Sequence, residues 1–426
     1  MITHQFDLSI VLPYVPDAGA ARRLLERLPL ACARLPEGTR WEVIATLPAT
    51  GQPSVEQALE PFASQTYRYP GNYGDSLREA LRLAGGEWIL TMETGLAHSP
   101  FIIPELFHRR TEADLVVASR FVECGYDNGN WLRSTAARWA NRFIGWVLDF
   151  PVRDLSSSFR LYRRRVFDEV SFEHEGFSVL LEILVRSYAA GFRLAEVPLH
   201  YFPLSRRPDF TFWQMAQGYL TTLYPLWQLR NSIDCADYDE RAFHSRIWFQ
   251  RSWQRWRYHA LVEMVRDCPR VLDIGCGSSQ VLEGLPQADG CDIRLNKLRH
   301  KRGRSGGLVR ASVFDLPFAS ESYDAVIFSQ VIEHLPRDPK ILSEVVRVVR
   351  PGGIVVVGTP DYATWWTTIE KIYGAVHPGG YADEHITHYT FASLKEEVEA
   401  LDCTYLDHRY VYGAELIMRF RKNDVH

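Results

Sequence analysis

Short apolar runs alternate along the whole chain with longer stretches in which apolar residues recur at helical spacing. Such runs, rich in Val, Ile and Leu, are typical of strands buried on both faces of a parallel sheet. The runs lie at 8–13, 41–46, 87–92 and 114–119 in the first half and at 270–275, 323–329 and 353–359 in the second. The alternation predicts two successive α/β domains, each with a mostly parallel sheet covered by helices.

Residues 231–241, NSIDCADYDER, are polar and lack periodicity, which indicates a linker. We place the domain boundary near residue 235, so the predicted domains are 1–235 and 236–426. A chain of 426 residues is long enough for two domains of about 200 residues, each with its own core.

The composition is that of a folded globular protein, with 46% hydrophobic and 23% charged residues. The 48 basic side chains nearly balance the 52 acidic ones, giving a formal net charge of −4. Proteins that bind nucleic acid by neutralising phosphates carry a basic surplus, so we expect no nucleic-acid partner. The seven cysteines are scattered without a Cys-x-x-Cys pair, which favours a reducing compartment, the cytoplasm, over a disulfide framework or a zinc site.

The sequence predicts no signal peptide, because the N-terminus lacks a basic start and a long apolar run, and no spanning segment of about 18 uncharged apolar residues. Residues 210–229 are aromatic-rich and uncharged, but Gln217 and Pro225 fit an interfacial helix better than a spanning one. The alternative is a helix buried between the domains. Peripheral contact with a membrane is therefore one expectation.

The segment Val271-Leu-Asp-Ile-Gly-Cys-Gly places Asp273, Gly275 and Gly277 at the carboxyl end of an apolar strand, just before a helix. Glycines there allow a tight turn and let a ligand approach the backbone. Asp292 closes the next short strand, where a carboxylate can hold both hydroxyl groups of a ribose. Asp315 then follows in VFDLPF.

This ordered set, with the turn Arg350-Pro-Gly-Gly, resembles the class I S-adenosylmethionine-dependent methyltransferases over roughly residues 265–405. The resemblance implies S-adenosylmethionine as the cofactor, and Ser279 stands where a third glycine is common. It assigns Asp273, Gly275 and Gly277 to the methionine part, Asp292 to the ribose and Asp315 to the adenine amino group. A dinucleotide-binding unit is the alternative, but the DLPF segment and the RPGG turn have no place in it.

Methyl transfer from a sulfonium is an in-line displacement that needs orientation more than a strong catalyst. An alcohol or phenol acceptor also needs a base that removes its proton, usually His, Asp or Glu. The candidates are Glu333 and His334 after the fourth strand, and His385 and His388 in a loop that faces substrate in similar enzymes. For His334 the alternative is a helix-start residue that contacts cofactor or backbone.

An aromatic and basic helix predicted over 244–261 allows two interpretations. It forms a lid over the cofactor, or Trp248, Trp253 and Trp256 dock one domain on the other. Its composition suits both equally.

Residues 85–165 and the segments after them carry a second resemblance, in GGEWILTMETGLAHSP, DLSSSFRLYRRRVFDEV and LLEILVRSYAAGFRLAEVPLHY. Their order resembles family 2 glycosyltransferases of the polyprenyl-phosphate (dolichyl-phosphate) mannose synthase type, over roughly 6–210. The resemblance implies a GT-A fold and transfer of a sugar from a nucleotide to a lipid phosphate.

The acidic residues of that family are incomplete here. Such folds hold the diphosphate through a divalent metal, Mg²⁺ or Mn²⁺, on an Asp-x-Asp motif, and the corresponding stretch is Glu93-Thr-Gly95, which leaves Glu93 as a metal ligand. Leu47 and Pro48 replace an acidic pair that grips the base, whereas Asp17 still matches an acidic position. We expect no tight, metal-dependent binding of a nucleotide sugar.

More of the family's residues are present in the part that binds the acceptor. The matching residues are Arg120, Arg160, Glu182, Arg206 and Arg207. Arginine suits phosphate recognition because its planar fork binds two oxygens at once. We therefore expect these arginines to bind a sugar or lipid-phosphate acceptor. The alternative for Arg120 and Arg160 is structural ion pairing.

The sequence as a whole predicts a bifunctional enzyme. The second domain methylates an oxygen of a sugar, glycolipid or metabolite, and the first transfers a sugar or only binds the acceptor. The fusion indicates one pathway, such as polysaccharide or glycolipid assembly. The alternative is a non-catalytic binding or scaffold protein with degenerate sites, and the nucleoside-contact residues kept in 271–315 favour the enzyme.

Overall fold

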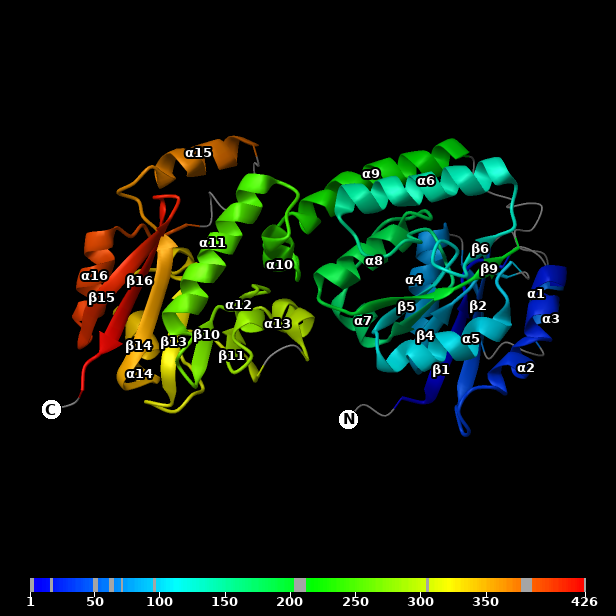
Figure 1. Ribbon diagram of the computed structural model, residues 1–426. Coiled ribbons are helices and arrows are strands. Elements are labelled where there is room, and N and C mark those ends of the chain that lie inside the picture. The colour runs from blue at the N-terminus through cyan, green and yellow to red at the C-terminus, as the bar shows by residue number, and fades with distance from the viewer. Residues whose placement is uncertain are drawn as a thin grey trace. The chain divides into compact units, whose positions relative to one another are not determined.

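The computed structural model describes residues 4–15, 18–48, 53–60, 65–69, 72–94, 97–202, 212–303, 306–376 and 385–424. The chain divides into two compact units, Met1–Asn231 (unit 1) and Ser232–His426 (unit 2), shown in Figure 1. Each unit contains a seven-stranded sheet with helices, which confirms the predicted α/β class.

The strands of the unit 1 sheet follow the order β3-β2-β1-β4-β7-β5-β8. Neighbours are parallel except around β7, which is antiparallel to β4 and β5. A short parallel pair, β6 and β9, stands apart. The bounds are β1 (Phe6–Leu12), β2 (Trp41–Pro48), β3 (Gln65–Tyr69), β4 (Gly86–Thr91), β5 (Leu115–Ser119), β6 (Tyr126–Asp127), β7 (Arg160–Arg163), β8 (Leu194–Pro198) and β9 (His200–Tyr201).

Strand β1 is buried on both faces of this sheet. Leu8, Ile10 and Leu12 join one apolar cluster, and Val11 joins a second. Burial on both faces explains why the strand is an apolar run and does not alternate. The covering helices are α1 (Ala18–Leu25), α2 (Leu28–Cys32), α3 (Pro53–Leu59), α4 (Tyr73–Leu83), α5 (Ile103–His108), α6 (Trp131–Leu148), α7 (Arg165–Glu169), α8 (Val179–Ala189) and α9 (Phe212–Arg230), with 3₁₀ turns η1 (Pro100–Ile102) and η2 (Arg109–Thr111).

The unit 2 sheet has the order β12-β11-β10-β13-β14-β16-β15. The first five strands are parallel, and β16 is antiparallel to β14 and β15. The chain moves from β10 to β11 on one side and reaches β13 on the other, so the carboxyl ends of β10 and β13 flank a topological switch point. The bounds are β10 (Val271–Ile274), β11 (Asp289–Asp292), β12 (Leu308–Arg310), β13 (Tyr323–Ser329), β14 (Val349–Pro360), β15 (Cys403–Val411) and β16 (Glu415–Lys422).

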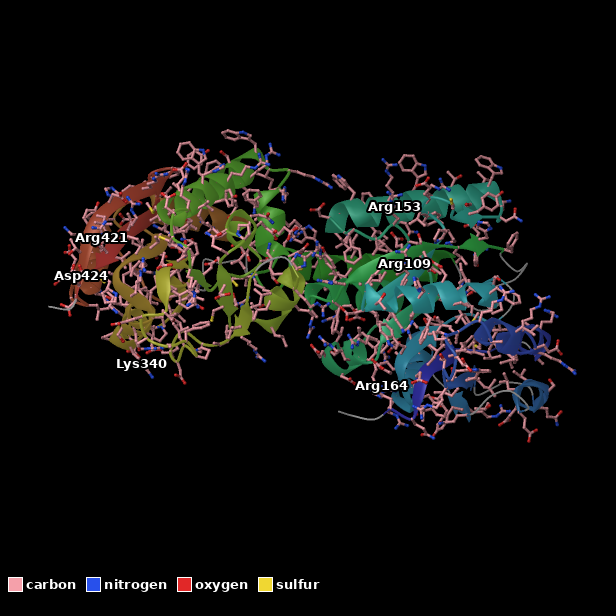
Figure 2. All side chains as sticks on the ribbon, turned by 60° about the horizontal axis from the view of Figure 1, so that its bottom comes forward. Arg109, Arg153, Arg164, Lys340, Arg421 and Asp424 are labelled. Atoms are coloured by element: carbon pink, nitrogen blue, oxygen red, sulfur yellow. The ribbon has the colours of Figure 1, made fainter. Side chains whose placement is uncertain are left out.

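The helices of unit 2 begin at recognisable caps. Asp338 accepts a hydrogen bond from the Lys340 N–H at the start of α14, and Thr390 and Ser393 form a capping box at the start of α16. Charged side chains such as Arg421 and Asp424 project from the periphery of this unit (Figure 2). The helices are α10 (Tyr238–Phe243), α11 (Trp248–Val265), α12 (Val281–Gly284), α13 (Leu295–Lys301), α14 (Pro339–Arg347), α15 (Trp366–Val376) and α16 (Phe391–Glu399), with the 3₁₀ turn η3 (Ile332–His334).

Helix α11 packs on its own sheet, an arrangement that neither sequence interpretation foresaw. The Trp253 Nε1–H and the Arg257 guanidinium donate to Glu415 of β16 at 2.6 Å and 2.5 Å. Trp253 also stacks on Tyr412. Because Glu415 is fully buried, this ion pair anchors the helix to the sheet.

Within the described ranges, no helix is both long and apolar enough to cross a membrane.

Candidate active site

A tight turn after β10 forms the first part of the site. Gly275 and Gly277 have φ values of +72° and +52°, a conformation that favours glycine. A side chain at Gly275 would also overlap the Val331 Cγ2 methyl group. The N–H groups of Gly275 and Cys276 donate to the Cys291 carbonyl at 2.7 Å and 3.1 Å, which anchors the turn on β11.

Two buried carboxyl groups flank this turn, Asp273 at 4% exposed and Asp292 at 8%. Asp292 accepts hydrogen bonds from the N–H groups of Gly277 (2.8 Å) and Arg294 (2.7 Å). Among the described residues, no hydrogen-bond donor reaches the Asp273 side chain, whose pKa is raised to about 7 by burial and then by the charge of Asp292. Buried polar groups in proteins normally have hydrogen-bond partners, so a bound ligand can supply the donor or cation that the Asp273 carboxyl group lacks.

Asp239 on α10 closes one side of the turn. It accepts hydrogen bonds from the N–H and the hydroxyl of Ser278, both at 3.0 Å, and from Lys297 Nζ at 2.7 Å. Burial alone would raise its pKa, but Lys297 and Ser278 outweigh burial and lower the pKa to about 2. Sequence reasoning missed Asp239, because it lies in the polar stretch taken for a linker and shows no spacing that marks a site.

Asp315, predicted to meet adenine, lies exposed in the loop after β12. Its N–H donates to the Ser312 carbonyl at 3.1 Å, which closes a short turn.

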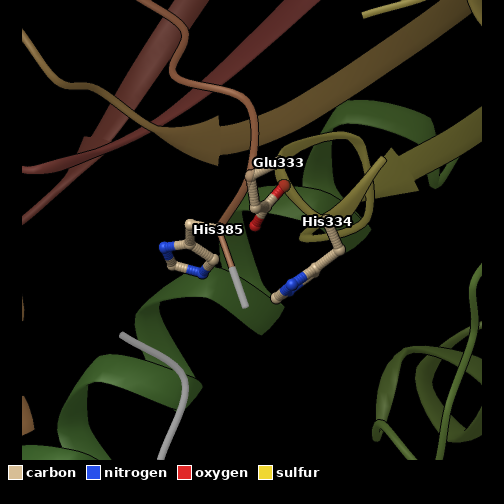
Figure 3. Close-up of side chains that lie close together, drawn as sticks. All are labelled: Glu333, His334 and His385. Carbon is tan, nitrogen blue, oxygen red and sulfur yellow. The ribbon is translucent and has the colours of Figure 1, made fainter. Parts of the chain in front are cut away.

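The second part of the site is a cluster of Glu333, His334 and His385 (Figure 3). One oxygen or nitrogen atom from each lies within 4.8 Å of the others. Turn η3 carries the first two at the carboxyl end of β13. The N–H groups of Ile386 and Thr387 donate to the Glu333 carbonyl at 3.0 Å and 3.1 Å, which fastens the segment of His385 to η3.

Glu333 is fully buried, and within the described parts of the chain neither carboxyl oxygen has a hydrogen bond of good geometry, although its own N–H and the Thr359 hydroxyl lie close enough to lower its pKa a little. Burial raises its pKa to about 8, so the group is mostly protonated at neutral pH. A neutral acid here can donate a hydrogen bond toward the cluster.

His385 is oriented by two groups that the sequence analysis did not identify. Its Nδ1 lies 2.9 Å from Glu370 Oε1 and 3.0 Å from the Tyr362 hydroxyl, and that hydroxyl donates to Glu370 at 2.8 Å. With a carboxylate at Nδ1, the ring proton belongs on Nδ1 and Nε2 is the basic nitrogen. His388, by contrast, is exposed and stacks on Tyr362, with ring centroids 3.9 Å apart.

The cluster offers two histidines and one glutamate as metal ligands. Among the described residues it is the one group of three or more such side chains close enough to hold a metal ion. Glu93, the predicted metal residue, is not part of such a group there. It follows β4, and its Oε1 accepts a hydrogen bond from the Ser158 hydroxyl at 2.8 Å. Asp17, Gly95, Arg206 and Arg207 lie outside the described residues, as does the Pro48 side chain, while Leu47 is buried in the core of unit 1.

Arg120 is held by an internal ion pair. Its Nε and Nη2 donate to the two oxygens of buried Asp154, both at 2.8 Å. Burial alone would raise the pKa of Asp154, but Arg120 outweighs burial and holds that pKa below its ordinary value. This geometry favours the ion-pairing alternative.

For Arg160, too, the geometry favours the structural alternative over a phosphate ligand. Its side chain is fully buried and donates to the carbonyls of Leu180 (2.5 Å) and Leu155 (2.9 Å), so it has no surface to offer a phosphate in this conformation. Glu182 is buried as well and accepts hydrogen bonds from the N–H groups of Glu173 (3.0 Å) and His174 (2.9 Å). Both residues hold the chain together locally.

Comparison with known proteins points to the same half of the chain. A family model described as a methyltransferase domain matches residues 272–357. An uncharacterized methyltransferase of Mycobacterium tuberculosis, found in three strains, is 46% identical over 63 residues, or 15% of this chain. The chain spans about a quarter of the length of these curated relatives, 24%.

Solved structures with a similar unit include two S-adenosylmethionine-dependent methyltransferases. The protein from Thermotoga maritima is 17% identical, and the match covers 43% of this chain and 94% of that one, with a TM-score of 0.35. The protein from Archaeoglobus fulgidus is also 17% identical, with 43% and 97% covered and a TM-score of 0.34.

The residues at the switch point suit S-adenosylmethionine. Asp273 lacks a donor, which an ammonium group supplies, and Asp292 keeps lone pairs for hydroxyl groups. The glycine turn leaves its backbone without side chains at two positions, so a ligand can approach closely. Residues 272–357 match a methyltransferase domain, and S-adenosylmethionine is the cofactor that this match and the residues of the turn support.

Proposed function

We propose that unit 2 transfers a methyl group from S-adenosylmethionine to an oxygen atom of a small-molecule acceptor. The observation that carries this proposal is the contact between the two parts of the site. Val331 packs against Gly275, and η3 begins at the next residue, Ile332. A cofactor on the glycine turn and a base in the cluster therefore serve the same acceptor molecule.

When bound, S-adenosylmethionine supplies a methyl group activated by its positive sulfonium. Asp292 accepts hydrogen bonds from the ribose hydroxyls, and the Gly277 and Arg294 N–H groups keep its carboxylate in place. Asp273 accepts from the ammonium group of the methionine part, and the exposed Asp315 meets the adenine amino group.

His385 is the proposed base. Its Nε2 takes the proton of the acceptor hydroxyl as the oxygen gains the methyl group, and Glu370 stabilises the imidazolium that results. Glu333, protonated at neutral pH, places no second negative charge beside this step. His334 lies next to His385, with ring centroids 4.9 Å apart, and contributes to the same wall.

The acceptor class follows from the aromatic surroundings of His385. Tyr362 and Trp366 both contact this ring, the latter with centroids 6.0 Å apart. Aromatic faces suit a sugar ring or a phenol, so we propose a hydroxyl of a sugar, glycolipid or aromatic metabolite as acceptor.

Calorimetry with S-adenosylmethionine and the full chain tests the assignment. We expect micromolar binding by the unmodified protein and a loss of about 100-fold or more in Asp292→Ala, because hydrogen bonds to a charged group contribute about 1.5–3 kcal/mol each. Asp407→Asn, at a half-buried residue of β15 that pairs with Arg419, is the control and should bind normally. Unchanged affinity in Asp292→Ala contradicts the site, and no binding by the unmodified chain favours a scaffold protein.

For unit 1 we propose a diverged GT-A-like domain that binds a sugar or lipid-phosphate acceptor. The supporting observation is that Glu93 follows β4 at the carboxyl edge of the sheet, where β1 separates β2 from β4. In open α/β sheets this is the crevice in which ligands bind. The full chain should bind uridine or guanosine diphosphate sugars weakly and without dependence on Mn²⁺; manganese-dependent transfer from such a donor overturns this.

Arg206 and Arg207 keep their predicted role within the same proposal. Replacing both by Ala in the full chain should raise the KM for the acceptor in the methyl-transfer reaction and leave the affinity for S-adenosylmethionine unchanged. This is the pattern expected when acceptor binding is lost. Lysine at both positions should restore part of the affinity, because it keeps the charge without the planar fork. An unchanged KM contradicts the role.

A further inference from the structure

Helix α6 exposes most of its large apolar side chains. Asn141, Ile144 and Leu148 are its buried residues. The large apolar side chains that it exposes are Trp131 (70%), Leu132 (60%), Trp139 (64%), Phe143 (57%) and Trp146 (61%). A surface helix normally has one apolar stripe, which faces the core, whereas α6 carries a second apolar stripe on its outer face.

The exposed aromatic surface of α6 is large for a single helix. An aromatic side chain has about 150–250 Å² of surface, so four of them, each about three-fifths exposed, present on the order of 500 Å². The largest apolar patch on a typical monomer covers about 300–600 Å² and often has a function.

Cations, and no acids, accompany these aromatic residues. Arg133, Arg138 and Arg142 are exposed on α6, and residues 131–148 contain no Asp or Glu. Helices with Trp, Phe and Leu beside Arg lie in the interface of anionic membranes, where the apolar groups enter the acyl boundary and the cations meet phosphates.

Helix α9 extends this surface. It contacts α6 and packs against α8, and Figure 1 shows α6 and α9 side by side. Thr222 and Leu226 are buried, while Leu220 and Tyr224, one turn apart, are 69% and 62% exposed. The interfacial helix expected over 210–229 is thus half-buried within its own unit and adds two apolar side chains beside α6.

We propose that α6, with the exposed residues of α9, docks unit 1 on an anionic phospholipid surface. A second copy of the chain is a poorer occupant, because a two-fold contact through α6 would bring two sets of three arginines together without an acid on either helix. The proposal does not depend on methyl transfer in unit 2.

Co-sedimentation of the full chain with vesicles tests the proposal. We expect binding to vesicles of phosphatidylcholine with 30% phosphatidylglycerol, weakening as salt rises, and little binding to phosphatidylcholine alone. The variant Trp139→Gln/Phe143→Gln/Trp146→Gln should bind at least tenfold more weakly. The variant Arg133→Gln/Arg138→Gln/Arg142→Gln should lose most of the salt dependence.

The matched control is Trp248→Gln/Trp256→Gln, which removes two equally exposed indoles from α11. It should bind vesicles like the unmodified chain, and thermal unfolding of each variant checks that it is folded. The proposal fails if the unmodified chain does not bind anionic vesicles, or if both α6 variants bind as well as the control. It also fails if sedimentation velocity shows a dimer that the α6 variants abolish, since the surface then binds a second copy.

Discussion

Two buried carboxyl groups of unit 2 differ from those of unit 1, and also from Glu415 and Asp292 of unit 2, which accept hydrogen bonds from their neighbours. In unit 1, Asp154 is paired with Arg120, and Glu182 accepts two backbone hydrogen bonds. In unit 2, Asp273 and Glu333 accept no hydrogen bond of good geometry from the described residues, and burial raises the pKa of both. Folding alone satisfies the first pair, whereas the second pair lies where a ligand completes the set. Unsatisfied buried acids therefore mark a site better than buried acids as such.

The largest loss of stability should come from removing a buried carboxylate that is paired in the folded protein. Asp154→Ala leaves the buried Arg120 guanidinium without its partner, and breaking such a pair costs about 3–5 kcal/mol. Scanning calorimetry should show a clearly lower Tm for unit 1, while Asp273→Asn should leave the Tm of unit 2 unchanged or raised at pH 8. If Asp273→Asn destabilises as much as Asp154→Ala does, the contrast between the two units is wrong.

His385→Gln should lower kcat about 100-fold or more, because the base that takes the acceptor proton is gone. Glu370→Gln should lower kcat about tenfold, since the carboxylate at Nδ1 orients the ring and stabilises the imidazolium that forms. His388→Gln is the matched control, and its rate should fall less than threefold. Equal losses in the two histidine variants would falsify the assignment of the base.

Gly275→Ala should destabilise unit 2 by about 1–3 kcal/mol, because alanine is strained at φ +72° and its methyl group would overlap Val331. Gly145→Ala in α6 is the opposite case. Nothing lies within 4 Å of the added methyl group, and alanine favours a helix by about 1 kcal/mol over glycine. Chemical denaturation should therefore show changes of opposite sign.

The last effect on stability is a pH dependence due to Glu333. Its folded pKa, about 8, lies above the unfolded value of about 4.5, so the folded state binds more protons between these limits. This contribution to stability is complete below pH 4.5 and is lost as the pH rises toward 8. Glu333→Gln should therefore stabilise unit 2 at pH 8 and change its stability little at pH 4.5, which denaturation at the two pH values measures.

A related measurement concerns the proton on Asp273. With a pKa of about 7 this carboxyl is mostly protonated at pH 6, and an ammonium group bound beside it favours the ionised form. Binding of S-adenosylmethionine at pH 6 should release close to one proton, and Asp273→Asn should abolish that release. Calorimetry in buffers of different ionisation enthalpy measures the number of protons.

The strands could be predicted from the sequence because each one is a continuous run of apolar residues. The runs at 8–13 and 270–275 fall on β1 and β10, since strands buried on both faces must be apolar throughout. The glycine turn and Asp292 were also within reach of the sequence, because backbone conformation and the strand end determine their spacing. The resemblance to methyltransferases then supplied the cofactor.

Only the tertiary structure showed what orients the base and what the arginines do. Glu370 reaches His385 from a separate helix, and Asp239 reaches Ser278 from the stretch taken for a linker, so no spacing along the chain reveals either pair. Arg160 matched a position that binds phosphate in the similar family, but it is buried and donates to backbone carbonyls. The type of residue at a position does not reveal whether its side chain is exposed. Hydrogen bonds and burial depend on which segments meet in space, and that is decided when sheets and helices pack, not when each segment forms.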